Sequence, residues 1–134
     1  MTDWIYQGTT LAQAPDEYLG FVYLITNTQF NKRYIGKKLF WTTKKLPPLK
    51  GRKNRRHTKV ETDWRDYWSS SPALLKDVAA LGTEHFRREI LTLCKNKNKM
   101  SYEEARLQFS QAVLLSDEWY NGIINCRISS RGLV

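Results

Sequence analysis

The sequence predicts a single α/β (α+β) domain, built on a small three-stranded, mostly antiparallel sheet that is flanked by helices. The chain has 134 residues, which is close to the size of one ordinary domain. Hydrophobic residues make up 41% and aromatic residues 13%, a composition typical of a packed globule rather than a disordered chain. Strand patterns and helix patterns follow one another along the chain, and such a set packs most simply as helices against one sheet.

The first two predicted strands form a β-hairpin. Residues 21–25 are aromatic and β-branched, and residues 33–40 form a second strand after a polar turn. Gly36 stands inside the second strand, which indicates a close approach by another backbone or by a ligand. Residues 1–19, ahead of the hairpin, carry turn formers and few periodic apolar positions, so we expect them to be an N-terminal extension.

Two helices and a third strand are predicted in the second half of the chain. The Ser-Pro pair at 71–72 is typical of an N-cap and a first helical position, and Gly82 ends that helix. Residues 86–94 form a strand pattern. Ser101 and Glu104 match a capping box, which predicts that the last helix begins at Ser101.

Positive charge is concentrated in one quarter of the chain. Residues 32–65 hold 13 Lys and Arg against 2 Asp and Glu, a net of +11, whereas the whole chain has a net charge of +9. Such a patch suits a polyanion, although a solvated basic loop stays open as the alternative. Residues 41–60 within it have almost no core-forming pattern, so we expect a basic insertion that runs over the surface.

The expected organisation is one domain with short ends: an N-terminal extension (1–19), the domain (20–128) and a C-terminal tail (129–134). No apolar run approaches the ~20 residues of a membrane span, and we expect no membrane partner. The first residues lack the basic and apolar pattern of an export signal, so a cytoplasmic location is expected. The two Cys and two His lack the paired spacing of a zinc site.

Two tripeptides on the predicted hairpin indicate the chemistry. Phe21-Val22-Tyr23 is separated by ten residues from Tyr34-Ile35-Gly36. This arrangement resembles the signature of the GIY-YIG nuclease superfamily, except that Phe21 stands where the family usually has Gly. Further segments (YIGKK, DWRDYWSSS, FRREIL, SYEEA and LLSDEWYN) resemble small phage-encoded Seg-type proteins related to homing endonucleases. The host cell cytoplasm is then the expected location.

The resemblance implies an endonuclease that hydrolyses phosphodiester bonds of double-stranded DNA with one Mg²⁺ (or Mn²⁺) ion. By the same resemblance, Tyr23 is the general base, Tyr34 orients the water or the phosphate, Glu104 is the metal ligand and Asn121 positions the site. This chemistry suits the residues, because a single carboxylate can hold a hydrated Mg²⁺ and a phenol can activate water when its pKa is lowered.

The basic insertion obscures the position of the catalytic arginine that the resemblance implies. Arg52, Arg55 and Arg56 are candidates, and we favour Arg56 with Arg55 close behind, because Arg is a fixed, always-charged phosphate clamp. The residues expected to contact DNA are Lys37, Lys38, Lys50, Arg52, Lys53, His57, Lys59 and Trp64.

Several structural alternatives stay open at this point. The tyrosines can be plain strand aromatics, Glu104 can serve only in its capping box with Glu103 as the metal ligand, and Asn121 can belong to a turn. The alternative function is a catalytically inactive nucleic-acid-binding module on the same fold, followed by an RNA-binding or phage-assembly protein with a basic arm. The sequence leaves DNA specificity and oligomeric state open.

Overall fold

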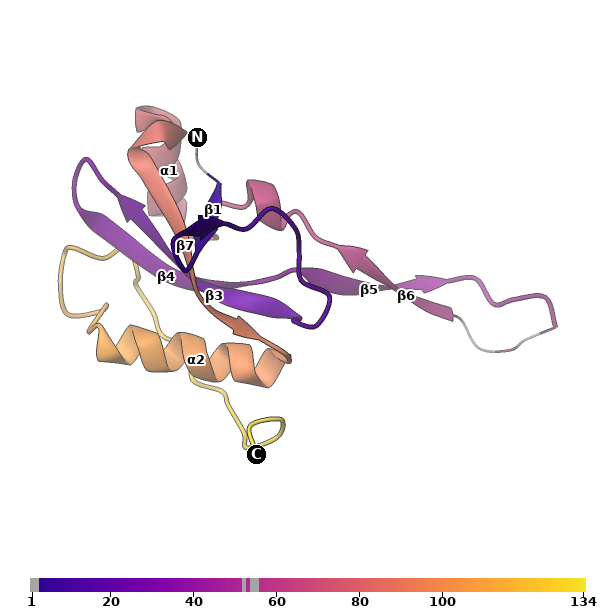
Figure 1. Cartoon of the computed structure of the whole chain (residues 1–134). Helices are drawn as coiled ribbons and strands as arrows, with labels where there is room; N and C mark the ends of the chain where they lie inside the picture. Colours follow the sequence, from indigo (N-terminus) through magenta and orange to yellow (C-terminus); the bar gives the residue numbers. More distant parts are fainter. Residues whose placement is uncertain (1–2, 52, 54–55) are drawn as a thin grey trace.

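The computed structural model describes residues 3–51, 53 and 56–134, without the side chains of Arg56 and His57. Five strands form one mixed sheet in the order β2-β1-β7-β3-β4, and two more form a separate ribbon (Figure 1). The strands of the sheet are β1 (Trp4–Tyr6), β2 (Thr9–Thr10), β3 (Gly20–Asn27), β4 (Lys32–Leu39) and β7 (Phe86–Cys94). The ribbon comprises β5 (Trp41–Leu46) and β6 (Arg56–Glu61), and the helices are α1 (Pro72–Leu81) and α2 (Lys97–Ser110). None of the helices among these residues is long and apolar enough to span a bilayer.

The predicted hairpin is confirmed as β3 and β4. Strand β3 lies between β4 and β7, pairs antiparallel with both, and is buried along nearly its whole length. Tyr23 lies directly opposite Gly36 in the β3–β4 ladder. On the other side of β3 the register shifts between Val22 and Tyr23, which is a β-bulge beside Tyr23.

The sheet is larger than the predicted three strands. Residues 1–19 supply β1 and β2, and β1 runs parallel to β7 with Trp4 opposite Arg88. Trp4 is only 2% exposed and belongs to the core. The sequence pattern missed these strands because three and two residues are too few to display the period-two alternation that marks a strand.

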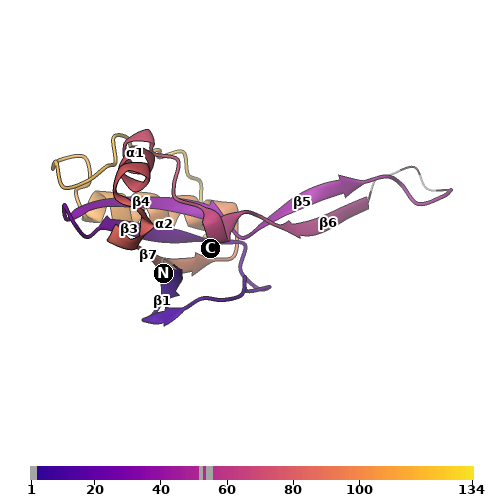
Figure 2. The ribbon, with the colours of Figure 1, turned by 90° about the horizontal axis from the view of Figure 1, so that it is seen from above.

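The two helices cover opposite faces of the sheet (Figures 1 and 2). Leu74 of α1 packs into a core on one face with Trp4, Phe21, Tyr23, Ile25, Phe40, Trp64, Phe86 and Ile90. Met100 of α2 packs into the core on the other face with Val22, Ile35, Cys94, Val113 and Trp119. As predicted, the Ser71 hydroxyl accepts a hydrogen bond from the Leu74 amide (3.3 Å) at the start of α1.

Helix α2 begins four residues earlier than predicted. It starts at Lys97, and the Asn96 side chain accepts a hydrogen bond from the Lys99 amide (2.8 Å) as the N-cap. The predicted capping box of Ser101 and Glu104 is therefore wrong, because both residues lie inside the helix. Lysine is a good helix former, so the Lys-rich segment extends the helix without an apolar stripe to mark it.

The basic insertion forms a ribbon instead of the expected surface loop. Strands β5 and β6 pair antiparallel from Trp41 opposite Glu61 to Leu46 opposite Arg56. The ribbon extends away from the domain in the direction in which β4 ends (Figures 1 and 2). The sequence did not predict the ribbon because its strands show no alternation of apolar and polar residues, since neither face of the ribbon is apolar.

The burial of Trp4 predicts that the N-terminal segment stabilises the domain. Trp4→Ala should lower the free energy of unfolding by about 3–5 kcal/mol, because it removes a buried aromatic side chain. Phe30→Ala is the matched control, since Phe30 is 61% exposed and its loss should change stability by no more than about 0.5 kcal/mol. Urea denaturation measures both; equal stability of the two variants would make residues 1–19 an extension after all.

Candidate active site

The two signature tyrosines and Gly36 meet on the face of the sheet that α1 covers. The Tyr23 and Tyr34 rings are inclined to each other with centroids 6.2 Å apart. A Cβ atom on Gly36 would lie 2.4 Å from the Tyr23 hydroxyl oxygen and 2.9 Å from Cε2 of Tyr34. Any other residue at this position would therefore displace both rings, so the glycine is required by the close approach of the phenols.

Tyr67 is a third phenol of this cluster. Its ring stands edge-on to that of Tyr23, with centroids 6.1 Å apart, and the two side chains hydrogen-bond. The Arg88 guanidinium donates to the Tyr67 carbonyl oxygen (2.8 Å) and lies against the rings of Trp4 and Trp68. Burial lowers the pKa of Arg88 to about 10, which leaves it protonated at neutral pH.

Burial controls the ionisation of the tyrosines. Tyr23 is 1% exposed, and burial raises its pKa well above the usual value, with smaller contributions from Tyr67, Tyr34 and Glu104. Burial also raises the pKa of Tyr34, whereas a hydrogen bond with Ser70 lowers it. Both phenols are therefore protonated at neutral pH in the protein alone.

Glu104 brings a carboxylate to the tyrosines from the helix on the other face of the sheet. Its charge contributes to the raised pKa of both Tyr23 and Tyr34, so it acts within electrostatic reach of both. The side chain is 13% exposed and lies 3.8 Å from the Lys37 ammonium, which also donates to the Ser101 hydroxyl (2.9 Å). Burial raises the pKa of Glu104, and Lys37 opposes that shift.

Glu103, the alternative ligand, has different partners. Its carboxylate binds Arg106 at 2.6 Å and Lys99 at 3.4 Å, both on the same helix. Lys37 therefore pairs with Glu104, and Glu103 is held in intrahelical ion pairs. Successive residues of a helix do not share a face, which explains why Glu103 and Glu104 have different ion-pair partners.

Asn121 fixes the edge strand from outside. Its side-chain oxygen accepts from the Ile35 amide (3.1 Å), and its nitrogen donates to the Ile35 carbonyl (2.9 Å). Gln108 of α2 donates to the same carbonyl oxygen (3.0 Å). Asn121 thus takes the place of a neighbouring strand at the residue between Tyr34 and Gly36, and holds the backbone that carries both.

A cleft of about 630 Å³ lies beside this cluster, between the beginning of α2 and the base of the ribbon. It is lined by Lys37, Lys38, Leu39, Thr42, Thr62, Asp63, Lys97, Met100 and Ser101. Lys38 pairs with Asp63 at 2.7 Å, and its ammonium lies 4.1 Å from the centre of the Tyr67 ring. Three lysines against one aspartate give the cleft an excess of positive charge, which suits phosphate.

The structure does not bring the favoured arginine to this cluster. Arg56 begins β6 at the end of the ribbon farthest from the sheet, whereas Glu61 ends β6 at its base (Figure 1). An arginine side chain is too short to return over that length of strand. The described cations that lie near the cluster are Lys37, Lys38 and the largely buried Arg88. Arg52 and Arg55 lie outside the described residues.

The other predicted DNA contacts lie between the ribbon strands, in β6 and just after β6. Lys50 and Lys53 are exposed in the segment that joins the ribbon strands, and Lys59 lies in β6, where it pairs with Asp16 at 3.6 Å. His57 belongs to β6, but its side chain is outside the described part. Trp64 is a correction, because it is fully buried and donates its indole N–H to Glu61 (2.8 Å), which leaves no surface for DNA.

A hydrated magnesium ion fits the donors of this site. Glu104 is the carboxylate that faces the tyrosines and the lysine cleft, and Mg²⁺ in proteins commonly keeps several waters beside one or two carboxylates. Among the described residues, no three His, Cys, Asp or Glu side chains gather into a metal cage. The donor set therefore suits a hard ion held by one carboxylate and water, and not zinc.

Sequence reasoning did not single out Tyr67 as a residue of the site. The contact with Tyr23 joins residues far apart in the sequence, so no local pattern reveals it. The only local signal is the position of Tyr67 shortly before the Ser70-Ser71 pair that begins α1.

One comparison with known proteins identifies a family for this chain. The family model SegE_GIY-YIG, described as "Putative endonuclease segE, GIY-YIG domain", matches residues 4–124. The match starts at β1 and ends just beyond Asn121, so it includes every element that forms the cluster. The searches of curated proteins and of solved structures found no match.

The space at Gly36 predicts a sharp effect of one methyl group. Gly36→Ala should destabilise the domain by roughly 1–3 kcal/mol, since the new Cβ overlaps the buried Tyr23 ring. Thermal denaturation measures the loss. Gly122→Ala is the control, because a Cβ there meets nothing within 4 Å. A Gly36→Ala variant as stable as Gly122→Ala would mean that the tyrosines do not pack over Gly36.

Proposed function

The chain belongs to the SegE family of GIY-YIG endonuclease domains, and from this premise we propose that it hydrolyses phosphodiester bonds of double-stranded DNA with one bound Mg²⁺ or Mn²⁺ ion. The observation that carries the proposal is that Tyr23 and Tyr34 meet over Gly36 with Glu104 within electrostatic reach of both, beside a cleft lined by lysines. Phosphodiester hydrolysis needs an in-line nucleophile, neutralisation of the phosphoryl oxygens and a proton for the leaving oxygen.

Glu104 is the proposed metal ligand. When bound, the ion would neutralise charge on the phosphoryl oxygens and lower the pKa of neighbouring proton donors. Within the protein, Lys37 lies 3.8 Å from the carboxylate and opposes the rise in its pKa that burial causes. The Ser101 hydroxyl accepts a hydrogen bond from the same ammonium, so the lysine is held between the carboxylate and the cleft.

The tyrosines are proposed to handle the proton and the water. Tyr23 is the proposed general base, which requires its phenolate form, and Tyr34 orients the water or the phosphate through its hydroxyl. Because burial raises the pKa of Tyr23, the phenolate is scarce at neutral pH, and its fraction grows about tenfold with each pH unit. Tyr67 hydrogen-bonds Tyr23 and holds its hydroxyl in place.

Lys37 and Lys38 are proposed to bind the phosphate in place of an arginine from the basic insertion. Both follow Gly36 directly and both line the cleft. Successive strand residues point to opposite faces, so Lys37 joins Glu104 while Lys38 lies over Tyr67. Positive charge is then available on both faces of the edge strand.

One observation favours the alternative of an inactive nucleic-acid-binding module. Lys37 already neutralises Glu104, and a cation must share or displace that partner to bind. The pair is separated by 3.8 Å and Lys37 is 40% exposed, so the ion pair is a weak one. DNA binding with no cleavage in Mg²⁺ or Mn²⁺ would support the inactive module.

The adjacent glutamates give a matched test of the metal ligand. Glu104→Gln should reduce cleavage of plasmid DNA at least about a hundredfold, whereas Glu103→Gln removes the same charge and should leave cleavage within about twofold of the wild type. The DNA affinity of both variants should stay close to that of the wild type. The opposite pattern would make Glu103 the ligand.

Melting temperature supplies the control for Glu104→Gln. A raised pKa means that the folded protein binds the Glu104 proton more tightly than the unfolded chain. Stability from this group is therefore present at low pH and is lost as the pH rises through the raised pKa. At pH above that value, Glu104→Gln removes a buried charge, and its melting temperature should be no lower than that of the wild type.

Removal of one hydroxyl tests the general base. Tyr23→Phe keeps the ring over Gly36 and should lower the cleavage rate by about a hundredfold or more, with little change in melting temperature. The wild-type rate should also rise as the pH rises through neutrality, because the phenolate fraction grows. Single-turnover cleavage measures both. Full activity of Tyr23→Phe, or a rate that falls with rising pH, would contradict the assignment.

A further inference from the structure

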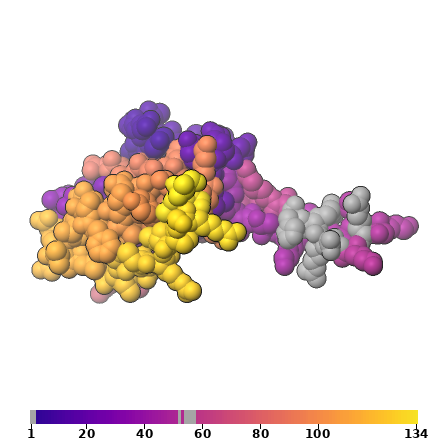
Figure 3. Space-filling view, turned by 90° about the horizontal axis from the view of Figure 1, so that it is seen from below, coloured from indigo at the N-terminus to yellow at the C-terminus, as the bar shows by residue number. Residues whose placement is uncertain are grey.

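The β5–β6 ribbon, together with the described residues between its strands (47–51 and 53), forms an arm that leaves the domain (Figures 1 and 3). Beyond Trp41, the described side chains of β5 are exposed or half-exposed, and so are those of residues 58–61 in β6. An isolated two-stranded ribbon is only marginally stable in water, so a free arm of this length gains from a partner.

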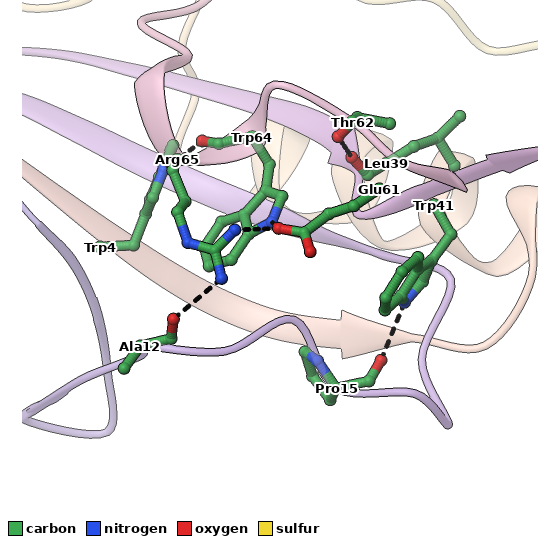
Figure 4. A network of polar contacts seen from close by, with 9 residues as sticks. All are labelled: Trp4, Ala12, Pro15, Leu39, Trp41, Glu61, Thr62, Trp64 and Arg65. Carbon is green, nitrogen blue, oxygen red and sulfur yellow. Dashed lines mark hydrogen bonds and ion pairs between the residues drawn. The ribbon is translucent and has the colours of Figure 1, made fainter. Parts of the chain in front are cut away.

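The base of the arm is fixed rigidly to the domain (Figure 4). The Thr62 hydroxyl donates to the Leu39 carbonyl (2.6 Å), and the Trp41 indole donates to the Pro15 carbonyl (3.1 Å).

The end of β6 is also bonded to the N-terminal segment. The Glu61 carboxylate accepts hydrogen bonds from Trp64 and Arg65. Arg65 also donates to the Ala12 carbonyl (3.1 Å), and the Trp4 indole donates to the Trp64 carbonyl. These bonds tie both strands of the ribbon to the sheet and to the N-terminal segment, so the direction of the arm is set by the domain.

The chemistry of the arm points to phosphate. Between residues 44 and 59 the sequence has no Asp or Glu, and its cations are Lys44, Lys45, Lys50, Arg52, Lys53, Arg55, Arg56 and Lys59. Such a segment repels itself unless a polyanion neutralises it.

The lysines of the described ribbon lie on both of its faces. Lys44 pairs with Thr58, and Thr43 pairs with Lys59. Since successive strand residues point to opposite faces, Lys44 lies on one face, whereas Lys45 and Lys59 lie on the other. A ribbon that lay flat on one DNA strand would use a single basic face. Two basic faces suit a ribbon placed between two phosphate backbones, and the major groove, about 12 Å wide, admits a two-stranded ribbon.

The cleft runs from the base of the arm to Lys37, the partner of Glu104. Thr42 and Thr62 at the base of the arm line the same cleft as Lys37 and Lys97.

The length of the ribbon sets how much DNA it can contact. Six residues of β5 span about 20 Å at ~3.3 Å per residue. A DNA strand advances about 3.4 Å per nucleotide, so the ribbon covers roughly six base pairs.

We propose that the arm enters the major groove of a DNA duplex on one side of the scissile phosphate only, so that the enzyme grips one flank of its cleavage position. This inference rests on the proposed function, because it takes the duplex that is cut as the partner. Exposed lysines on both ribbon faces, the fixed base and the continuous cleft support it. The other side of the scissile phosphate meets the domain without an arm.

Two charge-matched double variants test the arm by binding. Lys44→Gln with Lys45→Gln should flatten the slope of log K against log salt by nearly two units for duplex DNA, at about 0.9 for each lost phosphate contact. Lys32→Gln with Lys76→Gln removes the same charge from the start of β4 and from α1, away from the arm, and should change the slope by less than about half a unit. Equal slopes for the two double variants would overturn the proposal.

A shortened arm tests the one-sided grip by cleavage. Replacement of residues 44–58 by Asn-Gly joins Thr43 to Lys59, which are cross-strand partners, through a two-residue hairpin turn. On short duplexes in which one strand is end-labelled, the wild type should make no cut in that strand within roughly six base pairs of one of its ends, whereas the shortened arm should permit cuts there. An equal excluded zone at both ends of the labelled strand, or none, would overturn the one-sided grip.

The two measurements separate this inference from the proposed function. Absence of cleavage in Mg²⁺ and Mn²⁺ together with the expected change in salt slope would reject the nuclease and retain the arm. Normal cleavage with an unchanged slope would retain the nuclease and reject the arm. Single-stranded DNA and duplex RNA are the competing partners, and either one bound through Lys44 and Lys45 as tightly as duplex DNA would overturn the choice of a DNA duplex.

Discussion

The contact of the Tyr23 phenol with Gly36 is the constraint on which the site depends. The absent side chain at position 36 leaves room for a ring across the β3–β4 pair, where a Cβ would lie 2.4 Å from the hydroxyl oxygen. Ile35, the preceding residue, is hydrogen-bonded by the Asn121 side chain. The backbone under the phenol is therefore held by β3 on one side and by Asn121 on the other. The edge of the sheet can then combine tyrosines from one face with Glu104 from the helix on the other.

The proposed catalytic groups and most of the positive charge are separated in this molecule. The tyrosines and Glu104 are largely buried, and burial raises the pKa of all three, which favours their neutral forms. Most of the positive charge lies instead on the exposed ribbon and in the cleft at its base. Under the proposed function, such a division lets the arm set the affinity for a polyanion, while a small number of enclosed groups determine the rate.

The sequence predicted the elements that have long, regular patterns. The hairpin, α1 and β7 were predicted correctly because aromatic and apolar residues and the turn or cap residues that bound them mark these elements locally, and Gly36 was singled out because a glycine within a strand is unusual. Strand β1, the ribbon and the Tyr67 contact were missed, since they depend on pairings between distant segments. The predicted start of α2 was wrong because Ser101 and Glu104, which lie inside the helix, have the spacing of a capping box at a helix N-terminus.

The central claim is that the cluster around Gly36 hydrolyses DNA with a divalent ion. The most direct test is to incubate purified protein with supercoiled plasmid after removal of metal by a chelator, and then to add back Mg²⁺ or Mn²⁺. The account predicts no change in the plasmid without metal and conversion to open-circular or linear DNA once either ion is restored. Plasmid that is bound but stays supercoiled with both ions would contradict it.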